Sequence, residues 1–106
     1  MLTKSYYVYI ITNKRNGTLY IGVTNNLTRR IYEHRSGTVD GFSKDYGLAL
    51  LVYYEIHGEI NNAIAREKQL KDWHRSWKLR LIEKHNPLWI DLYNGGEVLP
   101  LPKPLE

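Results

Sequence analysis

The sequence contains no cysteine, which excludes disulfide bonds, thiolate zinc sites and a cysteine nucleophile. It also lacks any apolar run near the roughly 18 residues that a membrane-spanning helix needs. No long apolar segment follows the N-terminus, so we predict no secretory signal. A reducing cytoplasm is the simplest location for a protein without cysteine, and we expect no membrane partner.

The composition is that of a folded protein. Of its 106 residues, 42% are apolar and 25% are charged, a balance typical of one globular domain. We assign residues 1–97 to this domain. Residues 98–106 contain alternating prolines and are expected to form an extended, flexible tail.

Positive charge is unevenly distributed along the chain. The net charge is +4, but residues 1–37 carry +5, residues 66–84 carry +4, and the remaining stretches carry −5. A surface that binds a polyanion such as nucleic acid would produce this asymmetry, and so would amphipathic helices with solvated basic faces.

Two strands are predicted near the N-terminus, over residues 5–12 and 18–23. Both are rich in aromatic and β-branched residues, and Asn16-Gly17 between them is typical of a hairpin turn. Two registers are open: Thr12 opposite Gly17, which sets Tyr9 opposite Tyr20, or Arg15 opposite Thr18. The paired numbers sum to an odd value in both, so Tyr9 and Tyr20 share one face of the sheet.

A helix is predicted from Leu27 to Ser36, capped by Asn25 or Asn26 and ended by Gly37. Helical spacing aligns Arg30 and His34 with the apolar residues that should face the sheet.

The rest of the chain completes a small α+β fold. Leu48 to Ile56 is a nearly continuous apolar run, which we interpret as a central strand. A helical pattern from Ile60 to Lys84 predicts two helices or one bent helix, with Asp72 or Ser76 as an internal cap, before Pro87 ends it. Residues 88–92 are expected to form a short turn or helix. The predicted order is strand, strand, helix, strand, helix, helix, around a three-stranded antiparallel or mixed sheet.

Several of these residues are unusual if they serve folding alone. Tyr9 and Tyr20 share a face, Arg30 and His34 lie on an inward stripe, and Glu67 interrupts the apolar stripe of a later helix. Each also has a structural explanation: packing for a tyrosine, capping or core packing for a histidine, and an ion pair for a glutamate. Spacing alone leaves both interpretations open.

The order of these residues resembles the GIY-YIG nuclease superfamily. Tyr7-Val8-Tyr9 corresponds to the first tripeptide, with Tyr7 in place of its glycine, and Tyr20-Ile21-Gly22 matches the second in full. Arg30 and Glu67 match the arginine and the metal-binding glutamate of the family. The resemblance runs from about Tyr6 to Leu92 and is to small single-domain members. We expect Tyr7 to be harmless, because any residue adopts strand geometry.

The resemblance implies a role for each matched residue. Glu67 would hold one Mg²⁺ or Mn²⁺ ion, and Arg30 would bind phosphate oxygens. Tyr9 would be the general base toward water, Tyr20 would position the water or the phosphate, and His34 would assist proton transfer.

Further residues are predicted to contact nucleic acid, namely Arg30, Arg35, Lys44 and Asn86. The family also has an asparagine after the glutamate helix, for which Asn86 is the first candidate and Asn94 the second.

The function implied is a divalent-metal-dependent endonuclease that cleaves DNA, directed by DNA structure or damage, as in repair, with little sequence specificity. RNA remains open as a substrate. One alternative is a catalytically inactive nucleic-acid-binding module on the same scaffold. Another is a protein-interaction domain that works through the proline-rich tail.

Overall fold

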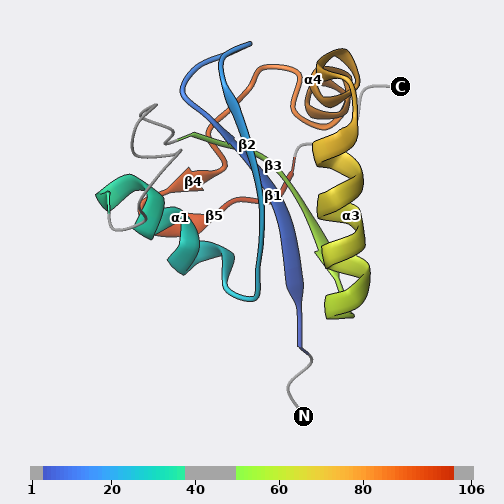
Figure 1. Ribbon diagram of the computed structural model, residues 1–106. Helices are drawn as coiled ribbons and strands as arrows, with labels where there is room; N and C mark the ends of the chain where they lie inside the picture. Colours follow the sequence, from blue (N-terminus) through green and yellow to red (C-terminus); the bar gives the residue numbers. More distant parts are fainter. Residues whose placement is uncertain (1–3, 38–49, 102–106) are drawn as a thin grey trace.

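The computed structural model describes residues 4–37 and 50–101 and confirms the predicted element order (Figure 1). The strands of the main sheet are β1 (Tyr6–Thr12), β2 (Leu19–Thr24) and β3 (Leu50–His57). The helices are α1 (Leu27–Ser36), α3 (Ile60–Asp72) and α4 (Arg75–His85). Lys44 lies outside the described residues. No helix in the two described ranges is long and apolar enough to cross a membrane.

The sheet is antiparallel, and its order is β2-β1-β3. The central strand is therefore β1, and the prediction that the third strand is central was wrong. The apolar run of β3 is buried for another reason. The segment that follows α4, which we call the C-terminal segment, covers the outer edge of β3. Here the backbone N–H of Leu92 donates to the carbonyl of Leu51.

The hairpin register sets Tyr9 opposite Gly22 and Ile11 opposite Tyr20. Neither predicted register is correct, because the true one lies midway between them. It keeps the same parity, however, so the prediction that Tyr9 and Tyr20 share a face is confirmed.

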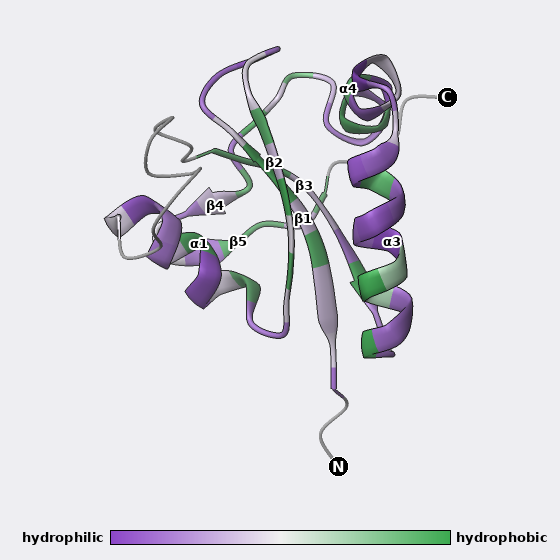
Figure 2. Cartoon of the chain, viewed as in Figure 1, coloured by the Kyte–Doolittle hydropathy of each residue, from purple (hydrophilic) through white to green (hydrophobic). Residues whose placement is uncertain are grey.

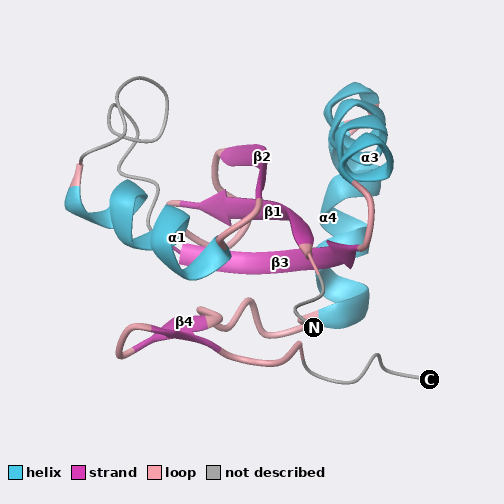
Figure 3. Ribbon diagram, turned by 90° about the horizontal axis from the view of Figure 1, so that it is seen from below, coloured by secondary structure: helices cyan, strands magenta, loops and turns pink. Residues whose placement is uncertain are grey.

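Apolar residues on the two faces of the sheet form two separate cores. Val8, Ile10 and Val52 pack against α3 and α4, whereas Tyr9, Ile11 and Leu51 pack against α1 and the C-terminal segment. Figure 3 shows this three-layer arrangement, with α1 on one side of the sheet and α3 and α4 on the other. Figure 2 shows hydrophobic residues along the strands and hydrophilic residues over most of α1 and α3.

Capping was predicted correctly for α1 but not for α4. The Asn26 side chain accepts from the backbone N–H of Arg29, and Gly37 ends α1 in the left-handed conformation. The N-cap of α4 is His74, whose side chain makes no capping hydrogen bond, so neither Asp72 nor Ser76 has the predicted role. The helix ends at His85, one residue beyond the predicted Lys84 and before Pro87.

A second hairpin, β4 (Tyr93–Asn94) and β5 (Glu97–Val98), follows α4 and was not predicted. Two glycines with positive φ, Gly95 and Gly96, form its turn. A turn, not a helix, precedes it, in which the backbone N–H of Trp89 donates to Asn86. The predicted tail starts within β5, and the carbonyl of its Leu99 accepts from the Tyr54 hydroxyl at 2.8 Å. Residues 102–106 lie outside the described residues.

Candidate active site

Three rings from separate elements meet on the face of the sheet covered by α1. The ring centroid of Tyr9 in β1 lies 6.3 Å from that of Tyr20 in β2 and 5.8 Å from that of His34 in α1. The Tyr20 and His34 centroids are 5.4 Å apart. The sequence pattern predicted the shared face of the tyrosines and the inward direction of His34, and the structure adds their convergence. We refer to Tyr9, Tyr20 and His34 as the aromatic cluster.

A buried hydrogen bond joins two members of the aromatic cluster. The hydroxyl oxygen of Tyr9 lies 3.0 Å from Nε2 of His34, and the two residues are only 2% and 5% exposed. Burial raises the pKa of Tyr9, and the neighbouring Tyr20 and Glu67 add to this effect. Burial also lowers the pKa of His34, as does the charge of Arg30. A protonated phenol therefore faces a neutral imidazole at neutral pH.

Gly22 is the residue that makes room for the Tyr9 phenol. A Cβ atom at position 22 would lie 2.5 Å from the Tyr9 hydroxyl oxygen and 2.6 Å from Cζ. The ring of Tyr9 thus crosses from β1 over β2, the edge strand of the sheet. Gly22 was predicted only as the last residue of the second tripeptide, with no role of its own. A glycine in a strand next to an inward tyrosine is the signal that indicates such a close approach.

Charged residues in opposite layers of the fold act on the pKa of Tyr9. Arg30 lies in α1, and its positive charge opposes the rise in the pKa of Tyr9, whereas Glu67 in α3 contributes to that rise. Because α3 packs against β1 and β2, and the phenol lies over β2, the Glu67 carboxylate is within electrostatic reach of the aromatic cluster.

Within the described residues, Glu67 and Arg30 each have one loose ionic partner. Oε1 of Glu67 is 3.4 Å from Nζ of Lys71, and the side chain of Glu67 is 16% exposed. Nη1 of Arg30 is 3.7 Å from Oε1 of Glu33, which also pairs with Arg29. Both pairs are long and each has a partly exposed cation, so an incoming phosphate or metal ion can displace them.

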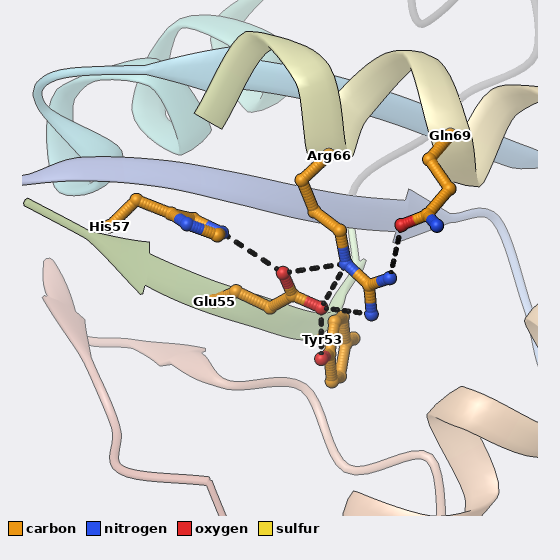
Figure 4. Close-up of polar contacts among 5 residues, drawn as sticks. All are labelled: Tyr53, Glu55, His57, Arg66 and Gln69. Atoms are coloured by element: carbon orange, nitrogen blue, oxygen red, sulfur yellow. Dashed lines mark hydrogen bonds and ion pairs between the residues drawn. The ribbon is translucent and has the colours of Figure 1, made fainter. Parts of the chain in front are cut away.

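A charged contact fixes the helix that carries Glu67 (Figure 4). Arg66 donates from Nε and Nη2 to the carboxylate of Glu55 in β3, at 2.9–3.0 Å. Tyr53 and His57 also contact this carboxylate, at 2.6 and 3.1 Å. Consecutive helical residues point about 100° apart, so Arg66 directed at β3 leaves Glu67 turned away from β3.

Two predicted nucleic-acid contacts are not part of this site. The guanidinium of Arg35 is paired with Asp91, donates to the Tyr93 carbonyl and lies 4.6 Å from the centroid of the Tyr93 ring. It holds the β4–β5 hairpin on α1 and is not directed toward the aromatic cluster.

Asn86 is also a structural residue here. It is fully buried, donates to the carbonyls of Val52 and Ile90, and accepts from the Ile90 N–H. Because Asn86 is buried and both polar atoms of its side chain form these hydrogen bonds, its side chain is not accessible to nucleic acid. The second candidate, Asn94, lies exposed in β4.

The replacement of the first motif glycine by Tyr7 leaves the strand regular. Tyr7 pairs with Thr24 within the β1–β2 ladder, and its ring lies 6.5 Å from the ring of Tyr54 in an edge-to-face contact. It therefore fills ordinary strand geometry, as expected.

The donor set fits a hard divalent cation bound by one protein ligand. Within residues 4–37 and 50–101, no group of three or more His, Asp or Glu side chains could hold a metal ion. Mg²⁺ in proteins keeps several waters and takes one or two carboxylates plus substrate phosphate oxygens. Glu67 can supply such a carboxylate, since its only ionic partner in the described chain is the exposed Lys71.

Known proteins are similar to this chain over most of its length. Residues 5–80 match the GIY-YIG catalytic domain. A UPF0213 protein of Staphylococcus haemolyticus is 37% identical over 79 residues, which cover 74% of this chain and 95% of that protein. A UPF0213 protein of Clostridium perfringens is 40% identical over 76 residues, covering 72% and 81%.

A solved structure is similar as well. The solution NMR structure of a UPF0213 protein from Bacillus halodurans aligns with a TM-score of 0.53 and 26% identity, over 82% of this chain and 92% of that one. The matched domain contains all five residues of the predicted catalytic set: Tyr9, Tyr20, Arg30, His34 and Glu67.

Proposed function

The chain belongs to the GIY-YIG catalytic domain family, and on that premise we propose that it is a divalent-metal-dependent endonuclease that hydrolyses phosphodiester bonds in DNA. The observation that carries the proposal is the hydrogen bond between Tyr9 and His34, next to Tyr20 and within the fields of Arg30 and Glu67. A scaffold that only bound nucleic acid would need no buried proton-transfer pair.

The first step assigned to this chain is proton removal from the attacking water. Because burial keeps the Tyr9 phenol protonated, it can accept a proton only while it gives its own away. His34 Nε2, 3.0 Å from the phenol oxygen and with a lowered pKa, is placed to take it. The water proton moves to Tyr9 and the phenol proton moves to His34. The resulting hydroxide attacks phosphorus, and the bond from phosphorus to the leaving sugar oxygen breaks. The leaving oxygen takes up a proton from solvent, to which His34 returns its own.

Arg30 would stabilise the negative charge that develops on the phosphate. Its guanidinium is partly exposed, and its planar donors match two phosphate oxygens. Binding substrate would exchange the loose Glu33 contact for a phosphate. Tyr20, beside Tyr9, would orient the water or the phosphate through its hydroxyl.

Glu67 is the residue that would hold the metal. A bound Mg²⁺ or Mn²⁺ supplies Lewis-acid stabilisation of phosphate charge and of the leaving oxygen. With a single protein carboxylate, the site depends on substrate for part of its affinity, so metal binding is expected to be weak without DNA.

No element of the described chain forms a base-reading module, which favours recognition of DNA structure or damage over sequence. Binding is then expected to depend mainly on phosphate contacts and to fall steeply with salt.

The test is a cleavage assay on plasmid, branched and single-stranded DNA with Mg²⁺ or Mn²⁺. We expect Glu67→Ala and Tyr9→Phe to abolish nicking while DNA binding persists, and Arg30→Ala to weaken both. Matched controls are Glu97→Ala and Tyr32→Phe, at exposed positions, and Arg29→Ala, the neighbour of Arg30 that shares its Glu33 partner.

Cleavage that survives Glu67→Ala would refute the assigned metal ligand. If the wild-type protein binds DNA but cleaves none of the substrates with either metal, the inactive binding module replaces the nuclease. Loss of a protein interaction after removal of residues 98–106 would instead support an interaction domain.

A further inference from the structure

An open groove begins at Tyr20 and follows the edge strand β2 to the β1–β2 turn. Its first part is a hollow of about 320 Å³ lined by Leu19, Tyr20, Ile21, Lys71 and Lys78. Its second part, of about 650 Å³, lies between the β1–β2 turn, including Lys14, and the start of α4 with Arg75. Leu19 and Lys78 line both parts, so the two hollows adjoin, and we treat them together as one groove.

The charge of this groove is entirely positive. Among residues 4–37 and 50–101, its lining includes Lys14, Lys71, Arg75 and Lys78, and no aspartate or glutamate. Within the described parts of the chain, Lys14, Arg75 and Lys78 form no ion pair, whereas Lys71 pairs with Glu67. In the described chain, the positive charge of three of the four cations is therefore not compensated by an acidic side chain.

Two of these cations are held in place by neutral groups. Nη2 of Arg75 donates to the carbonyl oxygens of Asn16 at 2.7 Å and Gly17 at 2.6 Å. Nζ of Lys78 donates to the carbonyl of Lys71 at 3.1 Å. Carbonyl partners orient a cation without cancelling its charge, so the groove is prepared for an anion before one arrives.

The dimensions of the groove fit a nucleic-acid strand. From Gly17 to Tyr20, β2 and its preceding turn cover three residue steps, or about 10 Å at the usual strand rise of about 3.3 Å. A DNA strand in a duplex carries one phosphate per about 3.4 Å of axis, so about three phosphates fall within this length.

We propose that this cationic groove binds the phosphate backbone of the DNA strand that leads into the aromatic cluster. The proposal rests on the proposed nuclease function only in that the bound strand ends at the scissile phosphate. Tyr20 marks the junction, because it belongs to the cluster and lines the groove. The groove is thus a binding site separate from Arg30, which lies in α1 on the face of the sheet opposite α3 and α4.

The test measures the salt dependence of binding by fluorescence anisotropy with labelled single-stranded and duplex DNA, in EDTA to prevent cleavage. Removing two phosphate contacts with Lys14→Ala/Lys78→Ala should reduce the slope of log K against log salt by about 1.4 on single strands and about 1.8 on duplex DNA. The loss should be the same for all DNA sequences. The matched control is Lys68→Ala/Lys84→Ala, which removes the same charge from exposed positions outside the groove.

Equal slopes for the two double variants would overturn the groove proposal. Thermal melting of both variants checks that each one is folded, and Lys14→Gln/Lys78→Gln provides a second measurement with less change in side-chain length. The outcome is independent of catalysis. A wild-type protein that cleaves, with equal slopes, keeps the nuclease and loses the groove, whereas reduced slopes without any cleavage keep the groove and remove the nuclease.

Discussion

Replacing Gly22 by alanine is expected to displace the Tyr9 phenol and thereby disable the candidate site. The added Cβ would lie 2.5 Å from the Tyr9 hydroxyl oxygen and 2.6 Å from Cζ. Comfortable contacts between such atoms are about 3.5 Å or longer, so the ring must move by about 1 Å. Tyr9 is only 2% exposed and is surrounded by the core beneath α1, which limits where it can go.

Two terms set the size of the effect on stability. Overpacking of a buried site costs about 1–3 kcal/mol, and loss of the hydrogen bond to His34 adds about 1 kcal/mol. Together the two terms give about 2–4 kcal/mol, and the lower value alone would reduce the melting temperature of a domain of this size by about 10 °C. A catalytic group moved by about 1 Å can also reduce the rate by about 100-fold.

The assays are thermal denaturation followed by circular dichroism and the plasmid-nicking assay. Gly58→Ala is the matched control, because nothing lies within 4 Å of a Cβ at that position, and its stability should change by less than about 0.5 kcal/mol. In a Tyr9→Leu background, which removes the clashing ring atoms, Gly22→Ala should cause little further destabilisation. Gly22→Ala protein that melts like the wild type and retains its activity would refute the reasoning.

Three further predictions concern other residues. Asn86→Ala should destabilise the fold by about 2–4 kcal/mol in urea denaturation, because it leaves backbone groups of β3 and of the turn after α4 unpaired. The control Asn94→Ala, at an exposed position, should have almost no effect. Similar losses of stability in both variants would contradict the structural role of Asn86. Burial acts to raise the pKa of Glu55, but hydrogen bonds, chiefly from Arg66, lower it overall. The wild type should therefore be more stable than Glu55→Gln above pH 4.5, and this difference in stability should shrink as the pH falls. A difference that stays constant with pH would contradict the prediction. Because folding lowers the pKa of His34, the unfolded chain takes up a proton first as the pH falls through about 6.5. The stability of the wild type should decline in this pH range, and His34→Gln should make the decline smaller. Melting curves measured over a pH series test this, and an equal decline in both proteins would contradict it.

Local features of the sequence were sufficient to predict α1 and the shared face of the tyrosines. The caps at Asn26 and Gly37 depend on residues within one helical turn, and both lie where the sequence indicates. The face of a strand residue depends only on parity, so Tyr9 and Tyr20 share a face although neither predicted register is correct. The family resemblance then named a set of residues whose convergence no local rule provides.

Long-range pairing decided what local patterns could not. Residues 91 and 92 cover the outer edge of β3, and this makes an edge strand look like a central one in the sequence. Arg35 forms an ion pair with Asp91 of the same C-terminal segment, and Asn86 is buried against β3.

The sequence by itself provided the candidate site residues, because residue type, periodicity and the family motifs are properties of short stretches of chain. Only the tertiary structure decided that the phenol of Tyr9 crosses to Gly22 and meets His34, and that four cations line one groove. These arrangements join β1, β2, α1, α3 and α4, and contacts between distant elements depend on how the whole chain packs.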